Sequence, residues 1–234
     1  MNVFHSQTAL LVGATGLVGA ELLKQLLEDE YYKEVIVLSR KESQLKHPKL
    51  SHHIVDFDNL DDYAHLIKAQ DVFCCLGTTI KKAKNKENFY KVDYIYPTEL
   101  AKIAKFNGTS LFSIVTAMGA CKGSTFYYNR VKGEVEEAIK HLQFKVTHII
   151  RPSLLLGERQ EFRLGEEIGK FVAKGLEFMM TGGLKKYKPI EARIVANAMY
   201  DLAKEHQDGY HIFESDKLQE IGEKANSLMS LAAH

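Results

Sequence analysis

The chain has 234 residues, of which 45% are hydrophobic and 26% are charged, a composition typical of a folded globular protein rather than a disordered or fibrous one. Thirty-one Lys and Arg residues balance thirty Asp and Glu residues, so the formal net charge is +1. The charge balance therefore gives no basic field that would gather nucleic acid or an anionic membrane, and we expect no nucleic-acid partner.

Neither the apolar runs nor the cysteines point to a membrane or secreted protein. The longest uncharged apolar run, residues 9–20, is shorter than the roughly 20 residues of a membrane-spanning helix. Residues 1–8 carry no Lys or Arg of the kind that opens a secretory signal. The cysteines Cys74, Cys75 and Cys121 form neither an even disulfide set nor a metal-binding pair, and no two histidines are four residues apart. We expect a cytoplasmic protein with no membrane span and no metal site.

Six short apolar runs alternate with helical patterns over the first two thirds of the chain. Such alternation is typical of βαβ units on a parallel sheet, and near-continuous apolar strands indicate a sheet covered on both faces. The runs are Ala9–Val12, Glu34–Ser39, His52–Phe57, Asp71–Leu76, Ser110–Thr116 and Lys145–Arg151. The sequence therefore predicts an α/β fold with a doubly wound parallel sheet, the Rossmann fold.

The regular pattern weakens after Arg151. A helix is expected near residues 190–205 and a short strand at 210–213, and no Pro-rich or Ser-rich linker precedes them. We interpret residues 1–234 as a single domain, with a core over about 1–151 and a small substrate-side extension over about 152–234.

Three glycines at a three-residue spacing lie where the first strand passes into the first helix, in the sequence GATGLVG. Gly13 would permit a tight turn, Gly16 would let a pyrophosphate approach the backbone, and Gly19 would let the helix pack closely. The free N–H groups at the helix start favour an anion, so the motif predicts a dinucleotide site. The expected cofactor contacts here are Gly13, Thr15, Gly16, Leu17, Val18 and Gly19.

The end of the second strand bears on the choice between NADP and NAD. An acidic residue there would bind the ribose hydroxyls of NAD, but the chain has Ser39 and Arg40, which suit a phosphate monoester. We therefore expect NADP(H), with NAD(H) as the alternative. The competing interpretation is an ordinary solvated loop, which also holds Glu42 and Lys46.

Further cofactor contacts are expected where later strands end. Asp56 is placed to accept a hydrogen bond from the adenine amino group, although an exposed strand-end aspartate is an equally good interpretation. The small residues after the fourth strand would let the backbone line the cofactor site. The full set of these contacts is Asp56, Phe57, Gly77, Thr78, Thr79, Lys132, Arg151 and Pro152.

Tyr128 and Lys132 are four residues apart, which places both on one face of a helix. A nearby ammonium lowers the pKa of a phenol, and this pair suits a proton donor to a carbonyl that receives hydride. Tyr200 and Lys204 have the same spacing, but they belong to a late helix whose apolar stripe marks it as a packing element. Thr116 ends the fifth strand, where its hydroxyl would hydrogen-bond the same substrate oxygen.

Five stretches of the sequence carry a resemblance to a known family: GATGLVG, CLGTTIKKAKNKENFYKVDY, TAMGA, YNRVKGEVE and RPSLLLGERQEFRLGE. They resemble the atypical short-chain dehydrogenase/reductases, and among them the subgroup of the human Tat-interacting, tumour-suppressor-like oxidoreductase and its bacterial relatives. The resemblance runs from about Leu10 to Lys224. It implies a Rossmann fold, NADPH at the glycine loop, and a Ser-Tyr-Lys active site that falls on Thr116, Tyr128 and Lys132. The family more often has Ser at the first position, and Thr adds a methyl group that narrows the pocket.

These observations predict an NADP(H)-dependent oxidoreductase acting on a small carbonyl or alcohol. Tyr128 would donate the proton, Thr116 would fix the substrate oxygen, and Lys132 would bind the nicotinamide ribose. One alternative is an NADPH-binding sensor or scaffold without chemistry. The other is a nucleotide-sugar epimerase, which needs a larger C-terminal domain. A homodimer is left open.

Residues 168–180 have an amphipathic helical pattern, and lysines follow over residues 185–188. A lid over an apolar substrate and a helix on a membrane surface are the functional interpretations. A core or subunit-contact stripe is the more ordinary one, and we favour it.

Overall fold

The computed structural model describes residues 7–157 and 186–232. Its centre is a seven-stranded parallel sheet with the strand order β3-β2-β1-β4-β5-β6-β9. The strands are β1 (Gln7–Val12), β2 (Tyr32–Ser39), β3 (Leu50–Ile54), β4 (Asp71–Cys74), β5 (Leu111–Val115), β6 (Val146–Arg151) and β9 (Gly209–Glu214). A separate short parallel pair joins β7 (Leu155–Leu156) to β8 (Ile190–Glu191).

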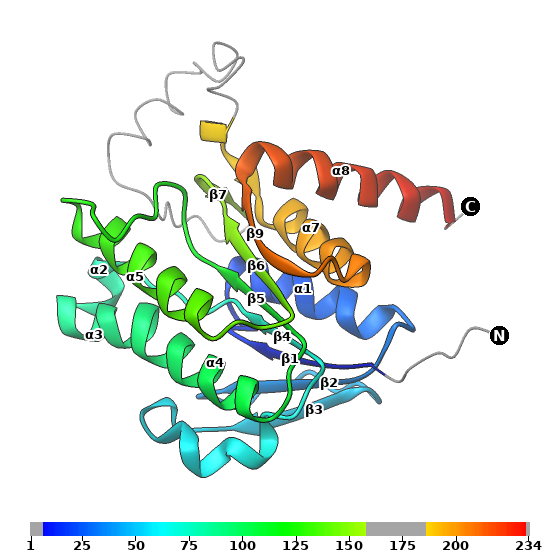
Figure 1. Ribbon diagram of the computed structural model, residues 1–234. Coiled ribbons are helices and arrows are strands. Elements are labelled where there is room, and N and C mark those ends of the chain that lie inside the picture. The colour runs from blue at the N-terminus through cyan, green and yellow to red at the C-terminus, as the bar shows by residue number, and fades with distance from the viewer. Residues whose placement is uncertain (1–6, 158–185, 233–234) are drawn as a thin grey trace.

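Helices cover both faces of the sheet. The longer ones are α1 (Leu17–Glu28), α4 (Tyr96–Phe106), α5 (Tyr127–His141), α7 (Ala192–Glu205) and α8 (Ser215–Ala232). The shorter ones are the 3₁₀-helical η1 (Phe57–Leu66), α2 (Ile80–Ala83), α3 (Lys86–Tyr90) and the π-helical turn η2 (Lys91–Ile95). In Figure 1, α1, α7 and α8 lie on one side of the sheet, and α4 and α5 lie on the other. The predicted doubly wound Rossmann fold is confirmed.

The predicted helical stripes are buried against the sheet because each helix turns one apolar face inward. In α1 the buried stripe is Leu22, Leu23, Leu26 and Leu27. In α4 it includes Leu100, Ile103 and Ala104. The α1 and α7 side chains form one apolar core, and those of α4, α5 and η1 form a second core on the opposite face.

All six predicted strands are present, and several of their boundaries differ from the expectation by one to three residues. β3 ends at Ile54 rather than at Phe57, although the Val55 amide still donates to the Ser39 carbonyl at 2.9 Å. The chain turns away there because the Asp56 side chain caps η1 by accepting from the Asp58 amide at 3.0 Å.

The part of the chain that follows Arg151 contributes to the sheet itself. The expected strand and helix are present as β9 and α7, and β9 pairs with β6 along its whole length, from Val146 opposite Gly209 to Arg151 opposite Glu214. The boundary expected near Arg151 therefore crosses a continuous sheet. The amphipathic stretch at 168–180 and Lys185, the first of the lysines that follow it, lie outside the described residues.

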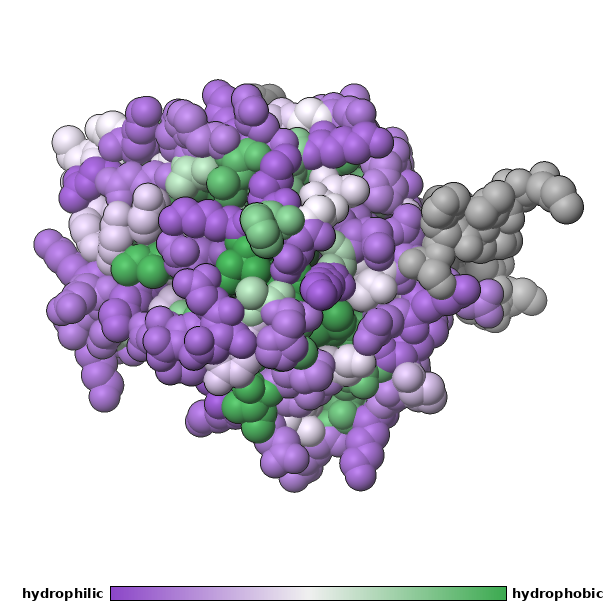
Figure 2. All heavy atoms as spheres, turned by 60° about the horizontal axis from the view of Figure 1, so that its bottom comes forward, coloured by the Kyte–Doolittle hydropathy of each residue, from purple (hydrophilic) through white to green (hydrophobic). Residues whose placement is uncertain are grey.

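Figure 2 brings forward the face that lies at the bottom of Figure 1, where β3 and η1 are found. Hydrophilic side chains dominate the described part of this face, and the apolar ones occur as separate small groups between them. Protein-binding and membrane-binding surfaces usually carry one large apolar patch. The scattered apolar groups on this face are instead typical of a surface that contacts water.

Candidate active site

The glycine loop after β1 has the backbone geometry that the motif predicts. Gly13 has φ +81°, and a Cβ atom there would lie 2.4 Å from the carbonyl oxygen of Cys75. A Cβ at Gly19 would lie 2.2 Å from the Gly13 carbonyl oxygen. Gly16 differs, because its nearest neighbour would be the Gly13 carbonyl oxygen at 3.3 Å. Two of the glycines are thus required by the turn and by helix packing, whereas Gly16 leaves space beside the loop.

Two of the pockets that adjoin this loop lie at the carboxyl ends of the strands. The first, here the Tyr128 pocket, encloses about 320 Å³ and is lined by Tyr128, Lys132, Thr116 and Asp93 among others. The second, the Arg40 pocket, lies toward β2 and is lined by Arg40, Phe57 and Tyr96 among others. Both pockets share walls formed by Gly16, Cys75, Leu76, Gly77 and Thr78. They meet between β1 and β4, where the strand order reverses, which is the usual ligand position in such sheets.

Lys132 of α5 projects into the Tyr128 pocket and forms an ion pair with Asp93 of η2. Its Nζ lies 2.7 Å from Asp93 Oδ1, and the exposed fractions of the two side chains are only 4% and 0%. The other carboxylate oxygen of Asp93 accepts a hydrogen bond from the Thr78 amide at 2.9 Å. The aspartate therefore joins α5 to the loop after β4.

The protonation of Lys132 reflects two opposing influences. Burial lowers the pKa of a lysine, but the Asp93 carboxylate, followed by Tyr128, acts in the opposite direction and holds the pKa of Lys132 above its usual value. Burial also raises the pKa of the neighbouring Cys74 thiol to about 12, so this thiol is neutral at physiological pH. Lys132 is accordingly an ammonium.

Thr116 lies where the sequence places it, at the end of β5 in the wall of the Tyr128 pocket, but its hydroxyl has another partner. Thr116 Oγ1 donates to Glu136 Oε1 at 2.6 Å and approaches the Ile150 carbonyl oxygen at 3.3 Å. A hydroxyl has a single proton to donate, so it cannot donate to a substrate oxygen while it donates to Glu136. This hydrogen bond opposes the expected contact of Thr116 with a substrate oxygen, which stays a prediction.

Arg151 is committed to the same buried glutamate. Its guanidinium binds Glu136 through two hydrogen bonds, Nε to Oε1 at 3.0 Å and a second from Nη2 to Oε2. The side-chain hydrogen bond to Glu136 raises the pKa of Arg151. We expected Arg151 to bind the cofactor, but the structure pairs its charge with Glu136 and does not place it in the wall of either pocket.

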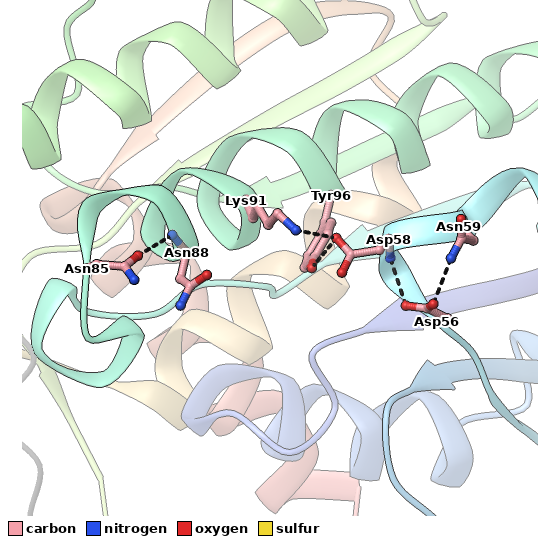
Figure 3. Close-up of polar contacts among 7 residues, drawn as sticks. All are labelled: Asp56, Asp58, Asn59, Asn85, Asn88, Lys91 and Tyr96. Carbon is pink, nitrogen blue, oxygen red and sulfur yellow. Dashed lines mark hydrogen bonds and ion pairs between the residues drawn. The ribbon is translucent and has the colours of Figure 1, made fainter.

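The Arg40 pocket is rich in cations. Lys82, Lys84 and Lys91 line it together with Arg40. The Lys91 ammonium lies 3.0 Å from Asp58, whose Oδ1 also accepts from the Tyr96 hydroxyl at 2.9 Å, as Figure 3 shows. These hydrogen bonds from Lys91 and Tyr96 hold the pKa of Asp58 below its usual value.

Two residues predicted at the adenosine end are engaged locally. The Ser39 hydroxyl donates to the Lys41 carbonyl and contacts His52 Nε2 at 2.7 Å, and Ser39 does not line the Arg40 pocket. Asp56 accepts from the Asp58 amide and, at 2.8 Å, from Asn59 Nδ2 (Figure 3). Because the Ser39 hydroxyl already bonds to Lys41 and His52, these hydrogen bonds compete with its predicted contact with a phosphate. The adenine contact of Asp56 stays a prediction.

The structure gathers most of the predicted site residues around the two pockets. Those in a pocket wall are Gly13, Thr15, Gly16, Leu17, Val18, Arg40, Phe57, Gly77, Thr78, Thr79, Thr116, Tyr128, Lys132 and Pro152. Those outside both walls are Gly19, Ser39, Asp56 and Arg151. The second Tyr-Lys pair is a packing pair, because Tyr200 is 1% exposed in the core and the Lys204 ammonium lies over its ring at 4.9 Å from the centroid.

Sequence reasoning missed Asp93 and Glu136, the two buried acids of the site. A signal for Asp93 exists, since it is the single acidic residue in the apolar helical run VDYIYP. Glu136 follows Lys132 by one turn of α5 and carries the same kind of signal, a charge on the inward face of a helix. The described residues contain no cluster of three or more potential metal ligands.

Comparisons with known proteins agree with this geometry. A family model described as NAD(P)H-binding matches residues 13–177. The chain belongs to this NAD(P)H-binding family. It is 36% identical over 170 residues to Protein HTATIP2 of Rattus norvegicus, covering 71% of this chain and 70% of that protein. It is also 33% identical over 219 residues to Protein fmp52, mitochondrial, of Aspergillus fumigatus, covering 91% and 93%.

The fold has a counterpart among solved structures. The Bordetella bronchiseptica enzyme WbmH in complex with NAD+ superimposes with a TM-score of 0.67, at 14% identity, over 98% of this chain and 84% of that one. At this identity the likeness shows the Rossmann fold. Together with the family, it establishes an NAD(P)H-binding domain with the Rossmann fold.

The described part of the chain has no helix long and apolar enough to span a membrane. The name of the Aspergillus fumigatus relative places that protein in mitochondria. The cytoplasmic location expected from the sequence therefore stays a prediction.

Proposed function

We propose that the protein is an NADP(H)-dependent oxidoreductase that transfers hydride between the nicotinamide ring and a small carbonyl or alcohol. The observation that supports this most directly is that Tyr128 and the charged Lys132 share one pocket, which continues through common walls into the pocket beside the glycine loop. The proposed proton donor therefore lies next to the proposed dinucleotide site. Carbonyl reduction requires this arrangement, because the carbonyl carbon receives a hydride and its oxygen receives a proton.

The walls of the two pockets fit the cofactor. Gly16 leaves room beside the start of α1 for a pyrophosphate, and the helix end there favours an anion. A Cβ at Gly77 would lie 3.5 Å from Asp93 Oδ1 and 3.6 Å from Lys132 Nζ, so this glycine lies directly beside the ion pair in the wall that the two pockets share. In the proposed complex Lys132 holds the nicotinamide ribose hydroxyls, and the Arg40 pocket holds the adenosine end.

Tyr128 is the proton donor in the proposed reaction. When bound, the reduced cofactor supplies hydride to the carbonyl carbon. The Tyr128 phenol gives its proton to the carbonyl oxygen, and the Lys132 ammonium stabilises the phenolate that is left by Coulomb attraction. The apolar wall of Leu17, Val115 and Met118 limits the water that reaches these groups.

The Tyr128→Phe variant is expected to bind NADPH normally and to lose turnover by about 10²- to 10⁴-fold, the usual contribution of a general acid. The assay is NADPH oxidation at 340 nm with a panel of aldehydes, ketones and quinones. Tyr127→Phe is the matched control, because the Tyr127 hydroxyl donates to the Lys86 carbonyl at 3.1 Å and does not line the pocket. Equal turnover by Tyr128→Phe and Tyr127→Phe would contradict the assignment.

Thr116 acts in this proposal as a positioning residue rather than as a hydrogen-bond donor to the substrate oxygen. Its hydroxyl and Arg151 both bind Glu136, and this cluster links the ends of β5 and β6 with α5 behind the pocket. The same hydrogen bond is the specific observation that supports the second candidate function, a non-catalytic NADPH sensor. Absence of turnover with every compound in the panel, with NADPH still bound, would favour the sensor.

A preference for NADPH over NADH is part of the proposal, supported by the cations Arg40, Lys82 and Lys84 in the wall of the Arg40 pocket. Arg40→Gln is expected to weaken NADPH binding by about 10-fold or more and to leave NADH binding unchanged, because it removes a charge-assisted hydrogen bond worth about 1.5 to 3 kcal/mol. Titration calorimetry with both nucleotides measures this. The exposed Lys81 lies outside the pocket wall, so Lys81→Gln is the control. An equal loss of NADH affinity in Arg40→Gln would refute the assignment.

A further inference from the structure

Asp93 lies at an unusual place in the backbone. It is the central residue of η2, the π-helical turn between α3 and α4. π-Helical turns inside helices are rare and occur most often at functional sites. The wide turn carries the carboxylate to the inner side of the helix, where its exposed fraction is 0%.

Both oxygens of this carboxylate are engaged by groups from other elements. Oδ1 lies 2.7 Å from the Lys132 ammonium of α5, and Oδ2 accepts from the Thr78 amide at 2.9 Å. The carboxylate is therefore fixed in orientation by two contacts that approach it from different segments. It holds Lys132 at the place where the two pockets share the walls of Gly77 and Thr78.

In the part of the chain that the structure describes, the groups that face Lys132 come from three elements. Asp93 lies on η2, Tyr128 lies one turn earlier on α5, and Cys74 ends β4. Burial keeps the Cys74 thiol neutral, and a phenol is neutral until it loses its proton. Among these groups, Asp93 is the one whose side chain forms an ion pair with Lys132, at 2.7 Å.

We propose that Asp93 is a positioning residue that keeps the Lys132 ammonium charged and fixed at the junction of the two pockets. The significance of that position rests on the function proposed above, in which Lys132 binds the ribose and stabilises the Tyr128 phenolate. Without Asp93, burial favours the neutral amine, because an isolated charge is poorly solvated in the protein interior. The lysine would then lose both its charge and the contact that orients it.

The test follows the Lys132 amine directly, by NMR of protein that carries ¹³Cε-labelled lysine, with the signal assigned by its loss in Lys132→Arg. In the wild-type protein Lys132 is expected to titrate above the ordinary range of a lysine side chain. In Asp93→Asn the titration midpoint is expected to fall by roughly two pH units or more, about 100-fold in the proton equilibrium, because burial then acts without the carboxylate that mainly opposes it. A merely structural role for Asp93 would not move this midpoint.

Asp58→Asn is the matched control. It removes a carboxylate from the exposed pair with Lys91, whose side chains are 52% and 39% exposed, and it should leave the Lys132 signal unchanged. A midpoint in Asp93→Asn within about half a pH unit of the wild-type value would overturn the proposal. If Asp93→Asn fails to fold, the titration of the wild-type protein still tests the proposal. A Lys132 amine that is neutral at pH 8 in the wild-type protein would also refute the proposal. None of these measurements uses turnover, so they separate a wrong role for Asp93 from a wrong proposed function.

Discussion

Replacing Asp93 with asparagine is expected to lower the free energy of unfolding by about 3 to 5 kcal/mol, the usual consequence of removing one partner from a buried ion pair. The cost is large here because Lys132 is 4% exposed and Asp93 is the carboxylate that forms an ion pair with it. For a chain of this length such a loss lowers the melting temperature by roughly 6 to 20 °C. Urea unfolding followed by circular dichroism measures it.

The double variant Asp93→Asn with Lys132→Met separates the charge from the packing. It removes both charges and keeps the volumes similar, so its stability is expected within about 1 kcal/mol of the wild type. The exposed pair of Lys91 and Asp58 provides the surface control, where Asp58→Asn should cost less than about 1 kcal/mol. A double variant as unstable as Asp93→Asn would show that shape rather than charge is lost.

The pH dependence of stability follows from the direction of the lysine shift. In the wild type the pKa of Lys132 is raised in the folded state, so this stabilisation is fully present below the unfolded pKa of about 10.4 and is lost as the pH rises through the folded pKa. In Asp93→Asn the folded pKa falls below the unfolded one, and the unfolded chain then binds the extra proton. The variant should therefore gain stability as the pH rises between the two values.

The sheet could be predicted from the sequence because its signals are local. A run such as Ala9–Val12 is apolar on both sides of the strand, and its neighbours in α1 repeat at helical spacing. These patterns need no knowledge of distant residues. β9 was harder to interpret, because an edge strand is covered on fewer sides and its residues Gly209–Glu214 include no fully buried side chain.

The site could be predicted where backbone geometry carries it, and not where long-range pairs decide it. Gly13 and Gly19 are fixed by contacts within a few residues or with the adjacent strand, so a motif reveals them. The direction of the Thr116 hydroxyl depends on Glu136, twenty residues later, which is itself held by Arg151. No local pattern contains that information, and the same is true of the pairing of Lys132 with Asp93.

Gly19→Ala is expected to destabilise the fold by about 3 kcal/mol or more and to abolish NADPH binding. The added Cβ would lie 2.2 Å from the carbonyl oxygen and 2.8 Å from the carbonyl carbon of Gly13, so α1 would have to move away from the loop. Both clashing atoms belong to the backbone, which cannot move aside as a side chain can, and overpacking of this kind costs about 1 to 3 kcal/mol or more.

Gly16→Ala is the matched variant, because it adds the same methyl group three residues earlier in the same loop. Its Cβ would meet the Gly13 carbonyl oxygen at 3.3 Å and the Cys75 carbonyl oxygen at 3.9 Å, so we expect a stability change of no more than about 1 kcal/mol. NADPH affinity should nevertheless fall steeply, since the methyl group faces the space where the pyrophosphate approaches the loop. Thermal unfolding with and without NADPH distinguishes the two variants: Gly19→Ala lowers the melting temperature of the free protein, whereas Gly16→Ala removes mainly the stabilisation added by NADPH. Full NADPH stabilisation of Gly16→Ala would mean that the cofactor does not bind at the start of α1.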